Sequence, residues 1–128
     1  MLQEYAKNPI CNFAMKDYTI KQHEGNFICW DDIVVYLRID KNIVLDYSFD
    51  GNCSTITIAA ASILSEVIIW SDINDVLNRW YLKMLSLGFE VSPRRKRAAV
   101  IAILAARNAI HKYLNDWKED TFDDLFDD

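Results

Sequence analysis

The sequence has too little positive charge for a protein whose main partner is nucleic acid. Its 128 residues hold 14 lysines and arginines against 19 aspartates and glutamates, a formal net charge of −5. Affinity for the phosphate backbone is supplied by a basic surface. We therefore expect no nucleic-acid partner, and the one local basic run, residues 94–97, is considered separately below.

The sequence also lacks segments that direct a chain to a membrane or across one. The first ten residues do not combine a basic stretch with a following apolar stretch, so they do not form a secretory signal. The longest apolar run, residues 56–70, is interrupted by polar side chains and is too short to span a bilayer. We expect a soluble, cytoplasmic protein with no membrane partner.

Cysteines are few, and their number is odd. The three, Cys11, Cys29 and Cys53, do not suit a disulfide framework, and in a reducing compartment they are thiols or metal ligands. No internal repeat is present. With 52% hydrophobic residues, the chain is of a size that forms one compact domain. We place this domain at residues 1–118 and an acidic C-terminal tail at residues 119–128.

Two neighbouring segments, residues 33–40 and 43–49, are rich in β-branched and aromatic side chains and predict a β-hairpin with its turn near residues 40–42. The second segment alternates. The pattern predicts one face made of Ile43, Leu45, Tyr47 and Phe49.

Three later segments predict helices, near residues 53–70, 72–87 and 94–117. The last has apolar residues at the three-to-four spacing of a single buried stripe, and tryptophans on these helices are expected in the core or at a dimer contact. The stripe consists of Val100, Ile103, Ala106, Ile110, Tyr113 and Trp117, and the helical tryptophans are Trp70, Trp80 and Trp117. The predicted fold class is α+β: a small antiparallel sheet, with a possible third strand from the N-terminal arm, packed on one face by helices.

Cys29 precedes the first predicted strand and Cys53 follows the second, so the two ends of the hairpin bring these positions to one end of the sheet. Asp31 lies two residues after Cys29. Two thiolates and a carboxylate suit a soft or borderline metal. The alternatives are two small buried thiols in place of ligands, and Asp32 in place of Asp31.

The remaining candidate ligands are weaker. Cys11 is an incidental thiol or a substitute ligand. His23 lies in the polar N-terminal arm and His111 on the last predicted helix, where a satisfied surface or boundary histidine is the simplest interpretation. Neither has the paired spacing of a histidine metal motif.

Four short motifs occur in an order that resembles one known family. They are Asn8-Pro9, Cys29-Trp30-Asp31, residues 49–53 (Phe-Asp-Gly-Asn-Cys) and residues 59–62 (Ala-Ala-Ala-Ser). Over about residues 5–115 the chain resembles the NifU N-terminal, IscU-type scaffolds on which iron–sulfur clusters are assembled. The SufE/NifU/IscU-like fold is the α+β arrangement predicted above.

The resemblance implies a scaffold rather than an enzyme. Cys29, Asp31 and Cys53 would bind iron or a nascent [2Fe–2S] cluster. A cysteine desulfurase would supply sulfur, and acceptor proteins would receive the cluster. A homodimer that shares one cluster between two chains would supply the four ligands that a [2Fe–2S] centre usually takes.

The chain departs from the family pattern at three positions. The family's third cysteine aligns with Ala98 in one register and with Ile101 in another, and neither is a thiol. Trp30 and Asn52 replace glycines beside the two matched cysteines. Two alternatives therefore remain: a zinc-binding sulfur-acceptor protein, or an interaction module that has lost metal chemistry.

The run Arg94–Arg97 puts four cations at the start of the last predicted helix, where the helix dipole disfavours them. One interpretation is a solvated helix start whose long side chains reach nearby carboxylates. The other is a positive field that stabilises thiolates at the cysteine site or docks an acidic partner.

Overall fold

The computed structural model describes residues 12–26, 31–52, 55–78 and 96–121. A three-stranded antiparallel sheet has the order β1-β2-β3, with β1 at Ile20–Asn26, β2 at Asp31–Asp40 and β3 at Ile43–Asn52. Helix α2 spans Thr55–Ile68, residues 73–78 are also helical, and α4 spans Lys96–Leu114. The α+β prediction is confirmed, and β1 is the third strand expected from the N-terminal arm.

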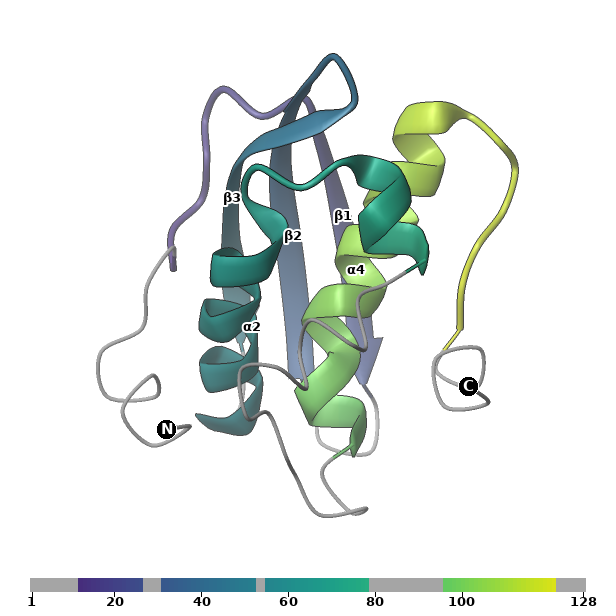
Figure 1. Ribbon diagram of the computed structural model, residues 1–128. Helices are drawn as coiled ribbons and strands as arrows, with labels where there is room; N and C mark the ends of the chain where they lie inside the picture. Colours follow the sequence, from purple (N-terminus) through teal and green to yellow (C-terminus); the bar gives the residue numbers. More distant parts are fainter. Residues whose placement is uncertain (1–11, 27–30, 53–54, 79–95, 122–128) are drawn as a thin grey trace.

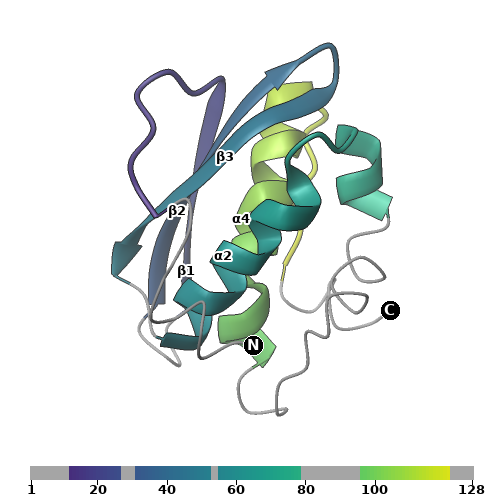
Figure 2. The same ribbon diagram turned by 60° about the vertical axis from the view of Figure 1, so that its left-hand side comes forward.

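The helices cover one face of the sheet, as Figures 1 and 2 show from two directions. Helix α4 packs against β1 and β2, while α2 packs against β3 and α4. Between these layers the described residues form an apolar core. Its largest fully buried side chains are Tyr47, Phe49, Ile33, Leu37, Ile63, Leu64, Ile68, Ile73, Ile101, Ile110, Val35 and Val44.

The β2–β3 hairpin turns at Lys41 and Asn42, which both have positive φ angles of 52° and 64°. Two successive residues in the left-handed region form the turn that best matches the twist of the flanking strands. The predicted turn position is therefore correct. Both strands extend beyond the prediction, to Asp31 at one end and Asn52 at the other.

Strand β3 contains an extra residue that its sequence does not reveal. Arg38 pairs with Asp46, whereas the next residue, Ile39, pairs with Val44. Leu45 is therefore the additional residue of a β-bulge. A bulge puts two residues of one strand opposite one residue of the other and shifts the alternation of the side chains beyond it.

The predicted face of β3 is correct for Tyr47 and Phe49 and wrong for Ile43 and Leu45. Tyr47 and Phe49 are buried, and beyond the bulge Val44 joins them with no exposed surface. Ile43 and Leu45 are only half-buried. Simple alternation fails here because the bulge lies within the run from which it was inferred.

Helix α4 is buried more completely than a single stripe predicts. Between residues 100 and 111 every residue except Arg107 is buried. A helix that is apolar on most sides is packed on most sides, and α4 accordingly contacts β1, β2 and α2. It is the central helix of the domain.

Two of the tryptophans expected in the core or at a dimer contact are on the surface. α4 ends at Leu114 because Asn115 adopts a positive φ of 55°, so Trp117 lies beyond the helix and is 92% exposed. Trp70, just after α2, has a φ of 72° and is 73% exposed. Neither belongs to the core, so for both the alternative of a dimer contact stays a prediction. Trp80 lies outside the described residues.

In the described part of the chain, no helix combines the length and the apolar character needed to cross a membrane.

Candidate functional site

The candidate site is the end of the sheet at which β1 ends, β2 begins and β3 ends. Asn26 pairs with Asp31 across β1 and β2, and Asp32 pairs with Asn52 across β2 and β3. Helices α2 and α4 both begin at this end, which is the lower end of the molecule in Figure 1. One end of the fold therefore gathers three strand ends and two helix N-termini.

The predicted cysteine ligands belong to the connections at this end. Cys29 belongs to the connection between β1 and β2, and Cys53 directly follows β3; both, like Cys11, lie outside the described residues. Asp31 is the first residue of β2, and its backbone pairs with Asn26. Within residues 12–26, 31–52, 55–78 and 96–121, no three His, Cys, Asp or Glu side chains are grouped closely enough to hold a metal ion.

The backbone conformation at residue 51, two residues before Cys53, requires a glycine. Its φ is 129°, a conformation that residues with a side chain rarely adopt. A Cβ atom added there would overlap the carbonyl oxygen of Asp32 and lie 3.0 Å from its carbonyl carbon. The close approach of β2 and β3 beside the candidate site therefore depends on this glycine.

Asp32 faces away from the helices. Its carboxylate contacts the ring of His23 on β1, and both side chains are well exposed, at 60% for His23 and 59% for Asp32. His23 thus belongs to a strand rather than to an irregular arm. Asp32 engages it on the outer face of the sheet, where Arg38 and Asp40 are also exposed.

The partial positive charges of the two helix N-termini at this end are not offset by acidic residues in the first turns of α2 and α4. Neither α2 nor α4 has an acidic residue in its first turn, and α4 begins with Lys96 and Arg97. Unpaired N–H groups and the helix dipole give such an end a partial positive charge, which favours anionic groups. This end of the fold is electrostatically suited to thiolates.

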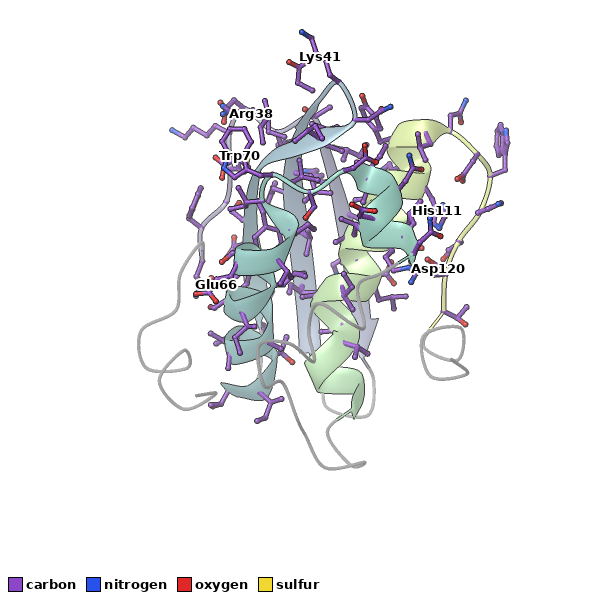
Figure 3. All side chains as sticks on the ribbon, viewed as in Figure 1. Arg38, Lys41, Glu66, Trp70, His111 and Asp120 are labelled. Atoms are coloured by element: carbon purple, nitrogen blue, oxygen red, sulfur yellow. The ribbon has the colours of Figure 1, made fainter. Side chains whose placement is uncertain are left out.

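A second polar cluster lies on the opposite half of α4, and sequence reasoning did not predict it. His111 is buried, with 7% of its surface exposed. Its Nδ1 lies 2.8 Å from Asp116 Oδ2 and its Nε2 lies 3.1 Å from Asp120 Oδ2. Arg107 Nε donates to the same Asp120 oxygen at 2.7 Å. Figure 3 shows His111 and Asp120 side by side at α4.

Asn108 connects this cluster to the sheet. Its Nδ2 donates to Glu24 Oε2 on β1 at 3.0 Å and to the backbone oxygen of Asp120 at 3.1 Å, and its Oδ1 accepts from the Asp120 N–H at 2.7 Å. The only sequence signal for these contacts was polar residues on an otherwise apolar helix. The hydrogen bonds from His111 and from the Lys118 N–H lower the pKa of Asp116 below its ordinary value.

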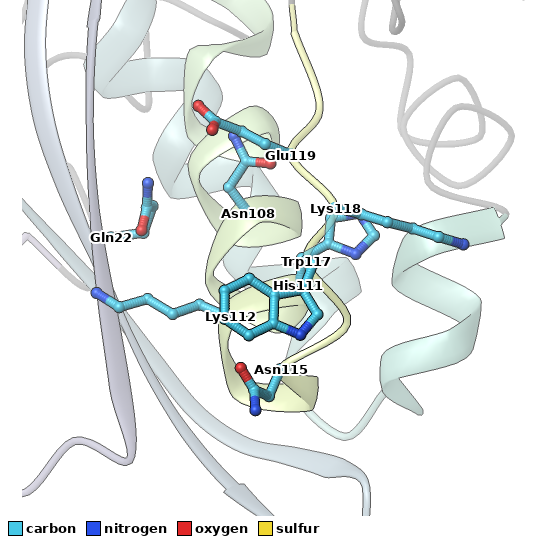
Figure 4. Close-up of a pocket in the computed structure, with 8 residues that line it drawn as sticks. All are labelled: Gln22, Asn108, His111, Lys112, Asn115, Trp117, Lys118 and Glu119. Carbon is cyan, nitrogen blue, oxygen red and sulfur yellow. The ribbon is translucent and has the colours of Figure 1, made fainter.

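The chain that follows α4 borders a hollow of about 370 Å³ beside this cluster (Figure 4). Its walls come from β1, from the last turns of α4 and from residues 115–119. The lining residues are Gln22, Asn108, His111, Lys112, Asn115, Trp117, Lys118 and Glu119.

Comparison with known proteins identifies related sequences. The family model described as the NifU-like N-terminal domain matches residues 2–120. The iron–sulfur cluster assembly scaffold protein IscU of Thermotoga maritima is 28% identical over 75 residues, which are 59% of this chain and 53% of that protein. The aligned part thus spans about half the length of that curated relative.

Solved structures share the fold. The N-terminal part of a NifU-like protein from Brucella abortus superposes with a TM-score of 0.71 at 13% identity, covering 91% of this chain and 93% of that one. A putative iron–sulfur cluster assembly scaffold protein for the SUF system from Fervidobacterium islandicum gives a TM-score of 0.72 at 17% identity, covering 85% and 93%. At these identities the superpositions show a common fold.

Proposed function

The chain belongs to the family of NifU-like N-terminal domains, and we propose that it is an iron–sulfur cluster assembly scaffold that binds iron or a nascent [2Fe–2S] cluster and passes it on without turnover chemistry of its own. The family match over residues 2–120 is the observation that carries this proposal. The relatives from Thermotoga and Fervidobacterium, both named as scaffolds, support the same general role.

We propose Cys29, Asp31 and Cys53 as the ligands. Chain connectivity supports this choice, because consecutive Cα atoms are about 3.8 Å apart and both cysteines lie within two residues of a described strand end. Those strand ends, Asp31 and Asn52, lie at neighbouring positions of one ladder, since Asp32 pairs with Asn52. Thiolates are the usual ligands of iron in such clusters.

Two residues of α4, Ala98 and Ile101, are the candidates for the position of the family's third cysteine. Ile101, one of the two aligned positions, has no exposed surface and belongs to the apolar core. Ala98, the other, belongs to the first turn of α4, and α4 begins at the end of the sheet where β2 begins and β3 ends. We therefore favour the alignment that puts Ala98 at the position of the family's third ligand.

Two proposed ligand thiols per chain are too few for a closed [2Fe–2S] site, which usually takes four ligands. We propose that the cluster is labile or is shared between two chains of a homodimer. A cysteine desulfurase as sulfur donor and iron–sulfur proteins as acceptors are the proposed partners. A labile cargo suits a protein whose role is to hand it on.

Anaerobic reconstitution with ferrous iron and sulfide tests the function. We expect bound iron and acid-labile sulfide on the wild type, and loss of most of both in Cys29→Ala and in Cys53→Ala. Cys11→Ala is the matched control and is expected to keep its cluster. Full cluster content in Cys53→Ala would contradict the ligand assignment, and a stable cluster on a strictly monomeric species would contradict sharing.

The same preparations distinguish the alternatives. Zinc without sulfide would favour the sulfur-acceptor function, in which a zinc-bound thiolate carries sulfur. No metal at all would favour an interaction module, which the absent third cysteine and Trp30 also favour. The pair Asp31→Asn and Asp32→Asn then identifies the carboxylate. We expect only the first to weaken metal binding, because Asp32 is engaged with His23 on the outer face.

A further inference from the structure

After α4 ends, the chain turns back along the helix, and residues 115–121 form what we call the C-terminal strap (Figure 1). Asp120 is its main attachment. The backbone of Asp120 exchanges two hydrogen bonds with the side chain of Asn108, and its carboxylate accepts from Arg107 Nε at 2.7 Å. Amide and guanidinium groups keep their protonation across the ordinary pH range.

Backbone bonds from Asn115 N to Lys112 O and from Asp116 N to His111 O also hold the start of the strap, and one further attachment depends on protonation. The two ring nitrogens of His111 lie 2.8 Å from Asp116 Oδ2 and 3.1 Å from Asp120 Oδ2. An ionised carboxylate can only accept hydrogen bonds, so each contact requires an N–H on the ring. A neutral imidazole has one N–H and an imidazolium has two. Only the imidazolium can satisfy both carboxylates.

We propose that the C-terminal strap is a pH-sensitive device, closed over α4 while His111 is an imidazolium and loosened when the ring loses a proton. Loss of that proton sets a nitrogen lone pair against a carboxylate, which turns one of the two attachments into a repulsion. A histidine side chain ordinarily changes charge between about pH 5 and 8. Since the strap borders the 370 Å³ hollow, loosening it opens that hollow.

The charged groups around His111 come from several elements. Arg107 on α4 forms an ion pair with the Asp120 carboxylate, and Lys112 Nζ donates to the backbone oxygen of Lys21. β1 contributes Glu24, which acts through Asn108. The strap adds Asp116, Lys118, Glu119 and Asp120.

Among the residues that the structure describes, the other elements around α4 contribute little charge. The only charged residue of α2 is Glu66, which is exposed, and the helix at 73–78 adds the half-buried Asp75. The charged residues of β2 after Asp31 are exposed: Asp32, Arg38 and Asp40. The two aspartates of the strap are therefore the groups in direct contact with the ring.

Hydrogen exchange of the Asp120 amide, followed by NMR on the full chain, tests the proposal. This N–H is bonded to Asn108 Oδ1 only while the strap is closed. The protection factor of this amide is the quantity to compare, because it removes the intrinsic pH dependence of exchange. We expect it to fall about tenfold between roughly pH 6 and pH 9.

The variant Asp116→Asn provides a sharp test of the mechanism. The asparagine Nδ2 can donate to the unprotonated Nδ1 of a neutral His111, while Nε2–H still donates to Asp120. The pH dependence of Asp120 protection should therefore shrink to less than about twofold in this variant. The matched control His23→Gln, on the outer face of the sheet, should keep the wild-type pH dependence.

Two results would overturn the proposal. One is a wild-type protection factor at Asp120 that is equal at pH 6 and pH 9. The other is an Asp116→Asn variant with the same pH dependence as the wild type. His111→Gln is expected to show low protection of the Asp120 amide at both pH values. If His111→Gln folds poorly, the comparison of Asp116→Asn with the wild type still decides the question.

Discussion

Gly51 and Asp32 approach so closely across the β2–β3 ladder that a Cβ atom on Gly51 would overlap the carbonyl oxygen of Asp32. The backbone on both sides of this contact leads to the proposed ligands, since Asp31 precedes Asp32 and Cys53 follows Gly51 by two residues. The backbone geometry beside the candidate site therefore depends on residue 51 having no side chain.

Replacing Gly51 with alanine is expected to destabilise the fold by about 2 kcal/mol, because the left-handed backbone and the overlap both oppose a Cβ atom. Urea denaturation followed by far-UV circular dichroism measures the change. Gly25→Ala is the control, because Gly25 lies on β1 without a positive φ. Equal stability of Gly51→Ala and the wild type would show that the strands can separate at this point without cost.

Adding the missing thiol should strengthen cluster binding. We expect Ala98→Cys to slow the loss of a reconstituted cluster to a chelator about tenfold, because a third thiolate joins the proposed site. Ile101→Cys is the matched control. It should leave cluster loss unchanged and lower stability by about 1 to 2 kcal/mol, because Ile101 is fully buried. Stabilisation by Ile101→Cys instead would reverse our choice of alignment.

Acid should remove the stabilising contribution of Asp116. Its pKa lies below the ordinary value of 3.8, chiefly through the hydrogen bond from His111. A depressed pKa means that the contribution is present above the unfolded value and is lost as the pH falls through the folded value. The stability difference between wild type and Asp116→Asn should therefore be larger at pH 6 than at pH 3.

Urea midpoints at the two pH values measure this difference. Asp40→Asn, at the exposed end of β2, controls for the general effect of removing one negative charge. A difference for Asp116→Asn that stays constant down to pH 3 would contradict the coupling to His111.

Trp70 is expected to be replaceable with a gain in stability. Its φ of 72° costs a residue with a side chain about 1 kcal/mol, and the residue is 73% exposed, so little apolar burial offsets that cost. Trp70→Gly should raise the free energy of unfolding by about 1 kcal/mol. Trp70→Ala keeps the backbone penalty and should gain much less; an equal gain would rule out the backbone explanation.

The local patterns of the sequence predicted those parts of the fold that depend on neighbouring residues. The hairpin turn at Lys41-Asn42 was predictable because short-range turn chemistry fixes it. The strand and helix patterns predicted the α+β class, and the family motifs agreed with it. In the chain, Cys29 and Cys53 lie within two residues of strand ends that belong to one end of the sheet. Cys29 and Cys53 themselves lie outside the described residues, so their role as ligands stays a prediction.

Tertiary packing decided what local patterns left open. The bulge at Leu45 exchanges the faces of β3 so that Val44 enters the core. Residues 100–111 of α4 are buried on most sides because two strands and a helix surround them. The end of α4 at Leu114 leaves Trp117 on the surface, although its spacing continues the apolar stripe.

The strap depends on tertiary structure most of all. Asn108 joins Asp120 to Glu24, a residue 84 positions away in the chain, and His111 lies between two aspartates that its own helix does not contain. Sequence alone predicted the α+β class and the hairpin, because hydrophobic periodicity and turn chemistry act over a few residues. Which polar groups meet, and in what state of protonation, was decided by the fold, because hydrogen bonds depend on distances that only the folded chain sets.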